Sequence, residues 1–308
     1  MKATKYLLFI PVLALLMNSC KKNATVTTSP KLIFKFKFDS TQTRYDSFGN
    51  VQDALPAGHE GQSPSFNAMS AHYIELARTR WDSVGRGEVL YLAPEVTTGG
   101  EKAIDFSQSV FAKDGEIFYE KSLKYVTPGD YEFLRVSLAY QNYDVKMTID
   151  TVISGFPIHQ DYPCTVASFV GFNTYVTNYK VKNQTLNVNA NKKQGYWGFE
   201  SLVSVPPYYS QTFLLSGQAP GTTVVNPIFA TSPIPSGSCL VTGPFPVGTK
   251  LHITGNETKD IVITVSLSTK KSFEWVEAAG HVNGKWEPTK GEAIVDMGIR
   301  GMEPSVQY

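Results

Sequence analysis

The sequence predicts an all-β protein of the β-sandwich class, immunoglobulin-like or related, with long proline-rich loops. Short runs in which apolar and polar residues alternate recur along the 308 residues, and turn residues separate them. No window keeps apolar residues at helical spacing for more than about three turns. Hydrophobic residues make up 42% of the chain and charged residues 18%, which is enough for a folded core and too little charge for a disordered chain.

The predicted strands follow from these patterns in chain order. The first covers residues 32–38, where phenylalanines alternate with lysines. Asp114-Gly115 is a turn signal before a strand at 116–120, and residues 127–130 form a turn with proline second and glycine third. The other predicted strands cover residues 72–76, 88–92, 131–140, 145–153, 167–174, 179–188, 195–205, 250–254, 261–267, 273–276 and 293–299.

One stretch offers a helical alternative, and one is irregular. Residues 70–82 could be read as a helix, but their Tyr, Ile and His content favours a strand. Residues 205–248 contain many prolines and predict a long irregular excursion, a kind of loop that often carries function. The body is predicted at 31–308, with a possible internal boundary near 154–163, a segment that reads equally well as a loop.

The amino-terminal residues 1–19 have the pattern of a secretory signal. Lys2 and Lys5 precede an apolar run of twelve residues, which is short for a membrane span of about 20 residues. Residues 20–30 are polar and small after Cys20, and predict a flexible tether. Without residues 1–19 the chain has 26 basic and 27 acidic residues, a net charge of −1, so nucleic acid is not a predicted partner.

Ser19-Cys20 at the end of the apolar run, followed by Lys21 and Lys22, resembles the signal of outer-membrane lipoproteins of the Bacteroidota. The resemblance implies that Cys20 is the lipidated first residue and that the membrane is a partner through this anchor. Lys21 in place of Asp implies sorting to the outer membrane. Lipoproteins of this group that are exported to the cell surface usually carry acidic residues just after the Cys, and none lies between positions 21 and 30. The resemblance therefore does not decide between the periplasmic face of the outer membrane and the cell surface. The alternative is an ordinary secretory signal.

Two further cysteines, Cys164 and Cys239, predict a disulfide in an oxidising compartment. The bridge would close a loop of about 75 residues and stabilise the fold by about 4 kcal/mol. It would also pin the 205–248 excursion to the body. Two buried free thiols are the alternative interpretation.

No enzyme signature is present, since the chain lacks a G-x-S-x-G elbow, a phosphate loop and an H-E-x-x-H motif. The weak metal candidates are His59, His72, His252 and His281, although none has ligand spacing. The candidate ligand-binding aromatics are Tyr208, Tyr209 and Trp197, because aromatic faces stack on sugar rings. Half-buried strand side chains are the alternative interpretation of these aromatics.

Residues 34–39, 71–76, 126–131 and 134–136 resemble, in their order, the periplasmic copper-binding β-sandwich proteins associated with methanobactin operons. This resemblance implies the fold and an envelope location, and no copper ligand is carried over from it. The first hypothesis is therefore a non-catalytic outer-membrane lipoprotein without a cofactor, whose loops bind an envelope protein or another ligand. A copper-handling lipoprotein is the alternative, and a glycan-binding surface module is the remote alternative.

Overall fold

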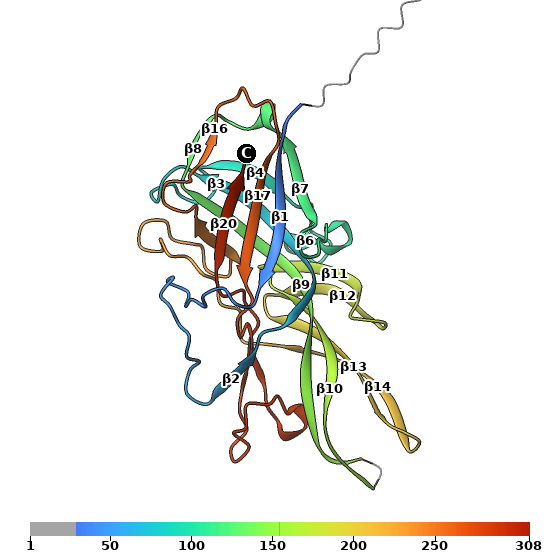
Figure 1. Cartoon of the computed structure of the whole chain (residues 1–308). Helices are drawn as coiled ribbons and strands as arrows, with labels where there is room; N and C mark the ends of the chain where they lie inside the picture. Colours follow the sequence, from blue (N-terminus) through green and yellow to red (C-terminus); the bar gives the residue numbers. More distant parts are fainter. Residues whose placement is uncertain (1–28, 154) are drawn as a thin grey trace, which may run out of the picture.

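The computed structural model describes residues 29–153 and 155–308 (Figure 1). The signal, Cys20 and most of the predicted tether lie outside the described residues. The fold is all-β, as predicted: it consists of strands and three short 3-10 turns. Among the described residues, no helix has the length and apolar character needed to cross a membrane.

The described residues form twenty strands in chain order. They are β1 Lys31–Asp39, β2 His59–Gln62, β3 Ser65–Ala77, β4 Glu88–Leu92, β5 Glu95–Val96, β6 Ala103–Asp105, β7 Ile117–Ser122, β8 Gly129–Tyr131, β9 Phe133–Ile153, β10 Phe156–Phe169, β11 Asn173–Lys180, β12 Thr185–Lys193, β13 Tyr196–Val205, β14 Tyr209–Gln218, β15 Leu240–Pro244, β16 Leu251–Ile253, β17 Ile261–Ser268, β18 Phe273–Val276, β19 Ile294–Asp296 and β20 Met302–Gln307. The 3-10 turns are η1 Phe106–Gln108, η2 Leu123–Tyr125 and η3 Pro288–Lys290.

Two sheets form the sandwich. One has the order β20-β17-β1-β7, and the other runs β14-β13-β10-β9-β3-β4, with β15 also paired to β9. Alternation along β1 and β17 points Phe34, Phe36, Ile263 and Val265 inward, where each is at most 1% exposed. These side chains meet Ile74 and other apolar residues of β3 and β9 in the first core.

Strand β9 continues beyond this sandwich and supports a second core. β9 has 21 residues, and its part from Tyr140 to Ile153 pairs with β10 over Phe169↔Tyr140 to Phe156↔Ile153. The carboxyl-terminal part of β9, from Tyr143 to Ile149, packs with β10, β13, β18 and the segment around Trp286. The hairpins β9–β10 and β13–β14 therefore extend away from the two-sheet body as one curled sheet (Figure 1).

Most predicted strands are confirmed, and the errors occur where a turn lacks Gly or Pro or where a loop is short. Residues 88–92 and 273–276 coincide with β4 and β18. The predicted strand at 179–188 is wrong, because β11 turns into β12 through Val181, whose N–H donates to the Gln184 carbonyl. The predicted strand at 167–174 likewise crosses from β10 into β11.

The irregular excursion and the region considered for a boundary also have defined structures. Residues 209–218 of the excursion form the regular strand β14, and the irregular part is 219–239. Within 154–163, residues 156–163 belong to β10 and pair with β9 in one sheet.

The predicted disulfide is wrong, since Cys164 and Cys239 are free and buried. Cys164 lies in the second core, where its Sγ donates to the Val145 carbonyl at 3.4 Å, whereas Cys239 lies in the first core. Burial raises the pKa of both thiols, that of Cys239 to about 12. Because the curled sheet places the two thiols in separate apolar clusters, each stays a protonated core side chain.

Candidate functional site

The strongest candidate site is an apolar groove on one face of the curled sheet, here called the aromatic groove. Its volume is about 440 Å³. Strands β9, β13 and β14 form its floor, and the segment that contains η3 forms one wall. Its lining consists of Met147, Ile149, Thr151, Val152, Trp197, Phe199, Phe213, Leu215, Trp286, Pro288 and Thr289.

The floor follows from strand alternation. Phe199 pairs with Leu215, and Trp197 pairs with Gly217, so alternate residues of β13 and β14 face the groove together. A Cβ atom at position 217 would lie 2.3 Å from Cζ2 of Trp197. The Trp197 indole therefore lies over a glycine, and the missing side chain is what lets the ring lie across the neighbouring strand.

The wall is fixed by backbone and carboxylate contacts. The Thr148 amide donates to the Trp286 carbonyl at 2.7 Å, which attaches the wall to the free edge of β9. The buried Glu292 carboxylate accepts from the Glu287 amide, and burial raises the pKa of Glu292. The Trp286 ring packs edge-on against Phe199 and Phe273. Because these contacts are all made within the chain, the groove is preformed.

The structure separates the three predicted aromatics. Trp197 lines the groove, whereas Tyr208 is 64% exposed at the tip of the hairpin and stacks on Phe156 with ring centroids 4.6 Å apart. Tyr209 packs against the second core and donates its hydroxyl to Gln211. Trp197 and Val205, which pairs with Tyr209, are eight residues apart on β13, or about 27 Å at 3.4 Å per residue. One sugar ring cannot contact both ends.

Trp197 is the one floor residue among the predicted candidates, and the floor residues that were not predicted include Met147, Ile149, Phe213 and Leu215. The available signal was the apolar residues at alternate positions of 145–153 and 209–218. The latter stretch was hidden inside a region described only by its prolines. Leu215 is 54% exposed, so an apolar side chain faces solvent at the rim of the groove.

The structure does not gather the candidate histidines into one site. His59 pairs with Glu274, His72 with Glu95 and His252 with Asp130, each on a different sheet. His281 lies in the loop after β18, and its amide donates to the Ala278 carbonyl. In residues 29–153 and 155–308, no group of three or more His, Cys, Asp or Glu side chains could hold a metal ion.

His72 lines a second cavity, of about 530 Å³, between β3, β9 and residues 235–238 of the excursion. His72 is 7% exposed, and its imidazole lies beside the ring of Phe172. Burial lowers the pKa of His72 from 6.5, and Glu95 only partly opposes this. His72 is therefore held as a neutral side chain at neutral pH.

We expect His72 to reduce stability as the pH falls. Its pKa is lower in the folded than in the unfolded chain, so below pH 6.5 the unfolded chain binds the proton more readily. The melting temperature measured from pH 8 to pH 5 should fall more steeply for the wild type than for His72→Gln. Identical slopes for the two proteins below pH 6.5 would contradict this assignment.

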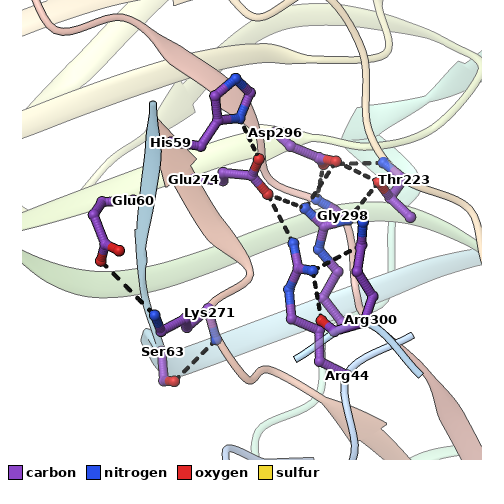
Figure 2. A network of polar contacts seen from close by, with 11 residues as sticks. Arg44, His59, Glu60, Ser63, Thr223, Lys271, Glu274, Asp296, Gly298 and Arg300 are labelled. Atoms are coloured by element: carbon purple, nitrogen blue, oxygen red, sulfur yellow. Dashed lines mark hydrogen bonds and ion pairs between the residues drawn. The ribbon is translucent and has the colours of Figure 1, made fainter. Parts of the chain in front are cut away.

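A buried charge network joins five separate parts of the chain: Arg44, His59, Thr223, Glu274 and residues 296–300 (Figure 2). The Glu274 carboxylate accepts from Arg44 at 2.8 Å, from Arg300 at 2.6 Å and pairs with His59 at 2.6 Å. Asp296 pairs with Arg300 at 3.0 Å and accepts from the amides of Thr223 and Gly298. Arg44, Glu274 and Arg300 are each at most 3% exposed, so the network is structural.

Comparisons with protein-family models, with curated proteins and with solved structures found no match to this chain. The resemblances to lipoproteins and to copper-binding sandwiches are tested by none of these comparisons and stay predictions.

Proposed function

We propose that this chain is a non-catalytic envelope lipoprotein, anchored to the outer membrane through Cys20, that binds a small and mainly apolar ligand in the aromatic groove. The groove carries the proposal, because its volume of about 440 Å³ lies in the range of small-molecule sites. Its lining has no charged side chain, which favours a neutral apolar group over an ion. Hydroxyls of Thr151 and Thr289 supply the polar contacts that orient a ligand.

The metal-handling alternative receives no such support, since His59, His72 and His252 each pair with a separate carboxylate. His281 lies apart from them in the loop after β18. The glycan alternative has less support, because Tyr208 and Trp197 lie at opposite ends of the β13–β14 hairpin and do not form one stacking surface for a sugar.

Binding of the neutral fluorescent probe N-phenyl-1-naphthylamine tests the groove. We expect saturable binding to the full chain in detergent, above the signal of detergent alone. Trp197→Ala should weaken it about tenfold, since it removes an aromatic contact face worth about 1–1.5 kcal/mol. Gly217→Ala should weaken it as well, because the added Cβ displaces the Trp197 ring.

Trp81→Ala is the matched control for the probe experiment. Trp81 is 70% exposed and lies outside the groove, so its removal should leave probe binding unchanged. Equal binding by the wild type and Trp197→Ala, or equal losses in both tryptophan variants, would refute the groove as the binding site.

The anchor is tested separately by fractionating cells that express Cys20→Ser. We expect the variant to leave the membrane fraction almost completely, because it lacks the acyl chains. Each CH₂ group that these chains bury in the membrane contributes about 0.8 kcal/mol to binding. Cys239→Ser, which alters a buried thiol of the body, should stay in the membrane fraction. Protease treatment of intact and lysed cells then distinguishes the cell surface from the periplasm. Retention of Cys20→Ser in the membrane would contradict lipid anchoring.

A further inference from the structure

The outer edge of β14 is an open strand edge. β14 pairs with β13 through ten residues in continuous register and has no neighbour on its other side among the described strands. No backbone–backbone hydrogen bond outside the β13 ladder involves residues 209–218 in the described part of the chain. Its outward N–H and C=O groups are therefore free to pair with another strand.

The other strands that end a sheet in the described chain carry features that block such pairing. Charged residues, a proline, register shifts or short length protect them. The features are Glu120 and Lys121 with a register shift at β7, Glu303 and Pro304 in β20, Lys192 and Lys193 with a register shift at β12, Glu88 with a register shift at β4, Pro244 in the five-residue β15, and lengths of two to four residues in β5, β2, β19, β8 and β16. β14 has no charged residue, no proline and no register shift.

The sequence of β14 is complementary to itself. Phe213, Leu214 and Leu215 form its centre, and uncharged polar residues or glycine lie on both sides. If two copies pair antiparallel about Leu214, Phe213 of each faces Leu215 of the other. Thr212 then faces Ser216, and the same faces of the two hairpins stay on the same side of the joined sheet.

We propose that β14 is a dimer interface, at which a second copy of this chain pairs antiparallel with β14 about Leu214. The pairing would satisfy the outward backbone groups of both strands and cover Leu215, which is 54% exposed. Figure 1 shows the β13–β14 hairpin extending away from the two-sheet body, so two bodies can approach through their hairpins. This inference does not rest on the proposed ligand in the aromatic groove.

Charge placement tests the register. Thr212→Lys/Ser216→Lys sets two pairs of lysines directly opposite each other across the interface, and Thr212→Glu/Ser216→Glu does the same with acids. Each double variant should raise the dissociation constant of the dimer about tenfold or more, and an equal mixture of the two should restore dimers. The mass of the full chain, measured by sedimentation in detergent, reports this.

Leu202→Lys/Ser204→Lys is the matched control, because it adds two lysines to β13 on the same face of the hairpin but one strand away from the edge. It should dimerise like the wild type. A wild type that stays monomeric up to about 100 µM, or a lysine variant as dimeric as the wild type, would overturn the proposal.

Oxidative cross-linking provides a second readout that does not depend on dimer strength. Leu214→Cys should form an intermolecular disulfide, since position 214 faces its own copy across the two-fold axis. Leu202→Cys should not, because three strand spacings separate it from its copy, about 14 Å, beyond the reach of a disulfide. Equal cross-linking of the two variants would exclude the proposed register.

Discussion

Glu274→Ala is expected to lower the free energy of unfolding by about 3–5 kcal/mol, because it leaves two buried guanidinium groups without their shared carboxylate. Arg44 and Arg300 both donate to Oε2 of Glu274, and neither side chain is more than 3% exposed. Arg300 keeps Asp296 as a partner, whereas Arg44 keeps only the carbonyl and amide oxygens of Gln52. Urea unfolding followed by tryptophan fluorescence measures the change.

The exposed pair between Lys270 and Asp53 provides the control for Glu274. Lys270→Ala removes an ion pair of similar length, 2.7 Å, and should change the free energy of unfolding by less than about 1 kcal/mol, because solvent screens exposed pairs. A loss of similar size in both variants would show that burial does not determine the strength of the Glu274 network.

Arg135→Ala is expected to have a comparable effect, a loss of about 3–5 kcal/mol. Arg135 on β9 is 1% exposed and pairs with Glu75 on β3, which is fully buried, at 3.2 Å. It also donates to the Asp82 carbonyl and to the hydroxyl of Ser232. The variant therefore leaves the buried Glu75 carboxylate without its charged partner, with only the amides of Gly85 and Gly87 as donors. It also removes one of the contacts that hold the irregular 219–239 segment.

Two readouts separate these consequences of Arg135→Ala. Urea unfolding gives the loss of stability, and limited proteolysis under native conditions should show faster cleavage within 219–239. Ser232→Ala is the matched variant, because it removes the contact to the excursion and keeps the Arg135–Glu75 pair. It should accelerate cleavage with a smaller loss of stability, about 1 kcal/mol. An unchanged cleavage rate in Arg135→Ala would contradict the role of Arg135 in holding the excursion.

Only part of the candidate site could be predicted from sequence. Trp197 was a candidate because of its residue type, and its half-buried place on a strand followed from alternation. Met147 and Leu215 could not be joined to it, because they lie on strands separated from it by about 50 and 18 positions. Their meeting depends on the register of β9, β10, β13 and β14, which local patterns do not determine.

The cysteine error has a similar origin. Cys164 and Cys239 are an even number of cysteines. An even number leads to a disulfide only if the fold brings the two thiols together. In the structure Cys164 faces the second core and Cys239 the first. A division of the interior into two cores follows from the length and curvature of β9, which the sequence presented as two separate strands at 131–140 and 145–153.

Local sequence pattern was enough to predict the all-β class, because alternation with period two and turn residues act over a few neighbouring positions. It also determined that β14 is uncharged, which is a property of residues 209–218 alone. The tertiary structure decided that this strand is a sheet edge, that Trp197 lies over Gly217, and that Glu274 holds two arginines. These features join residues far apart in the chain, and the free energy that selects them comes from burial and pairing across the whole fold.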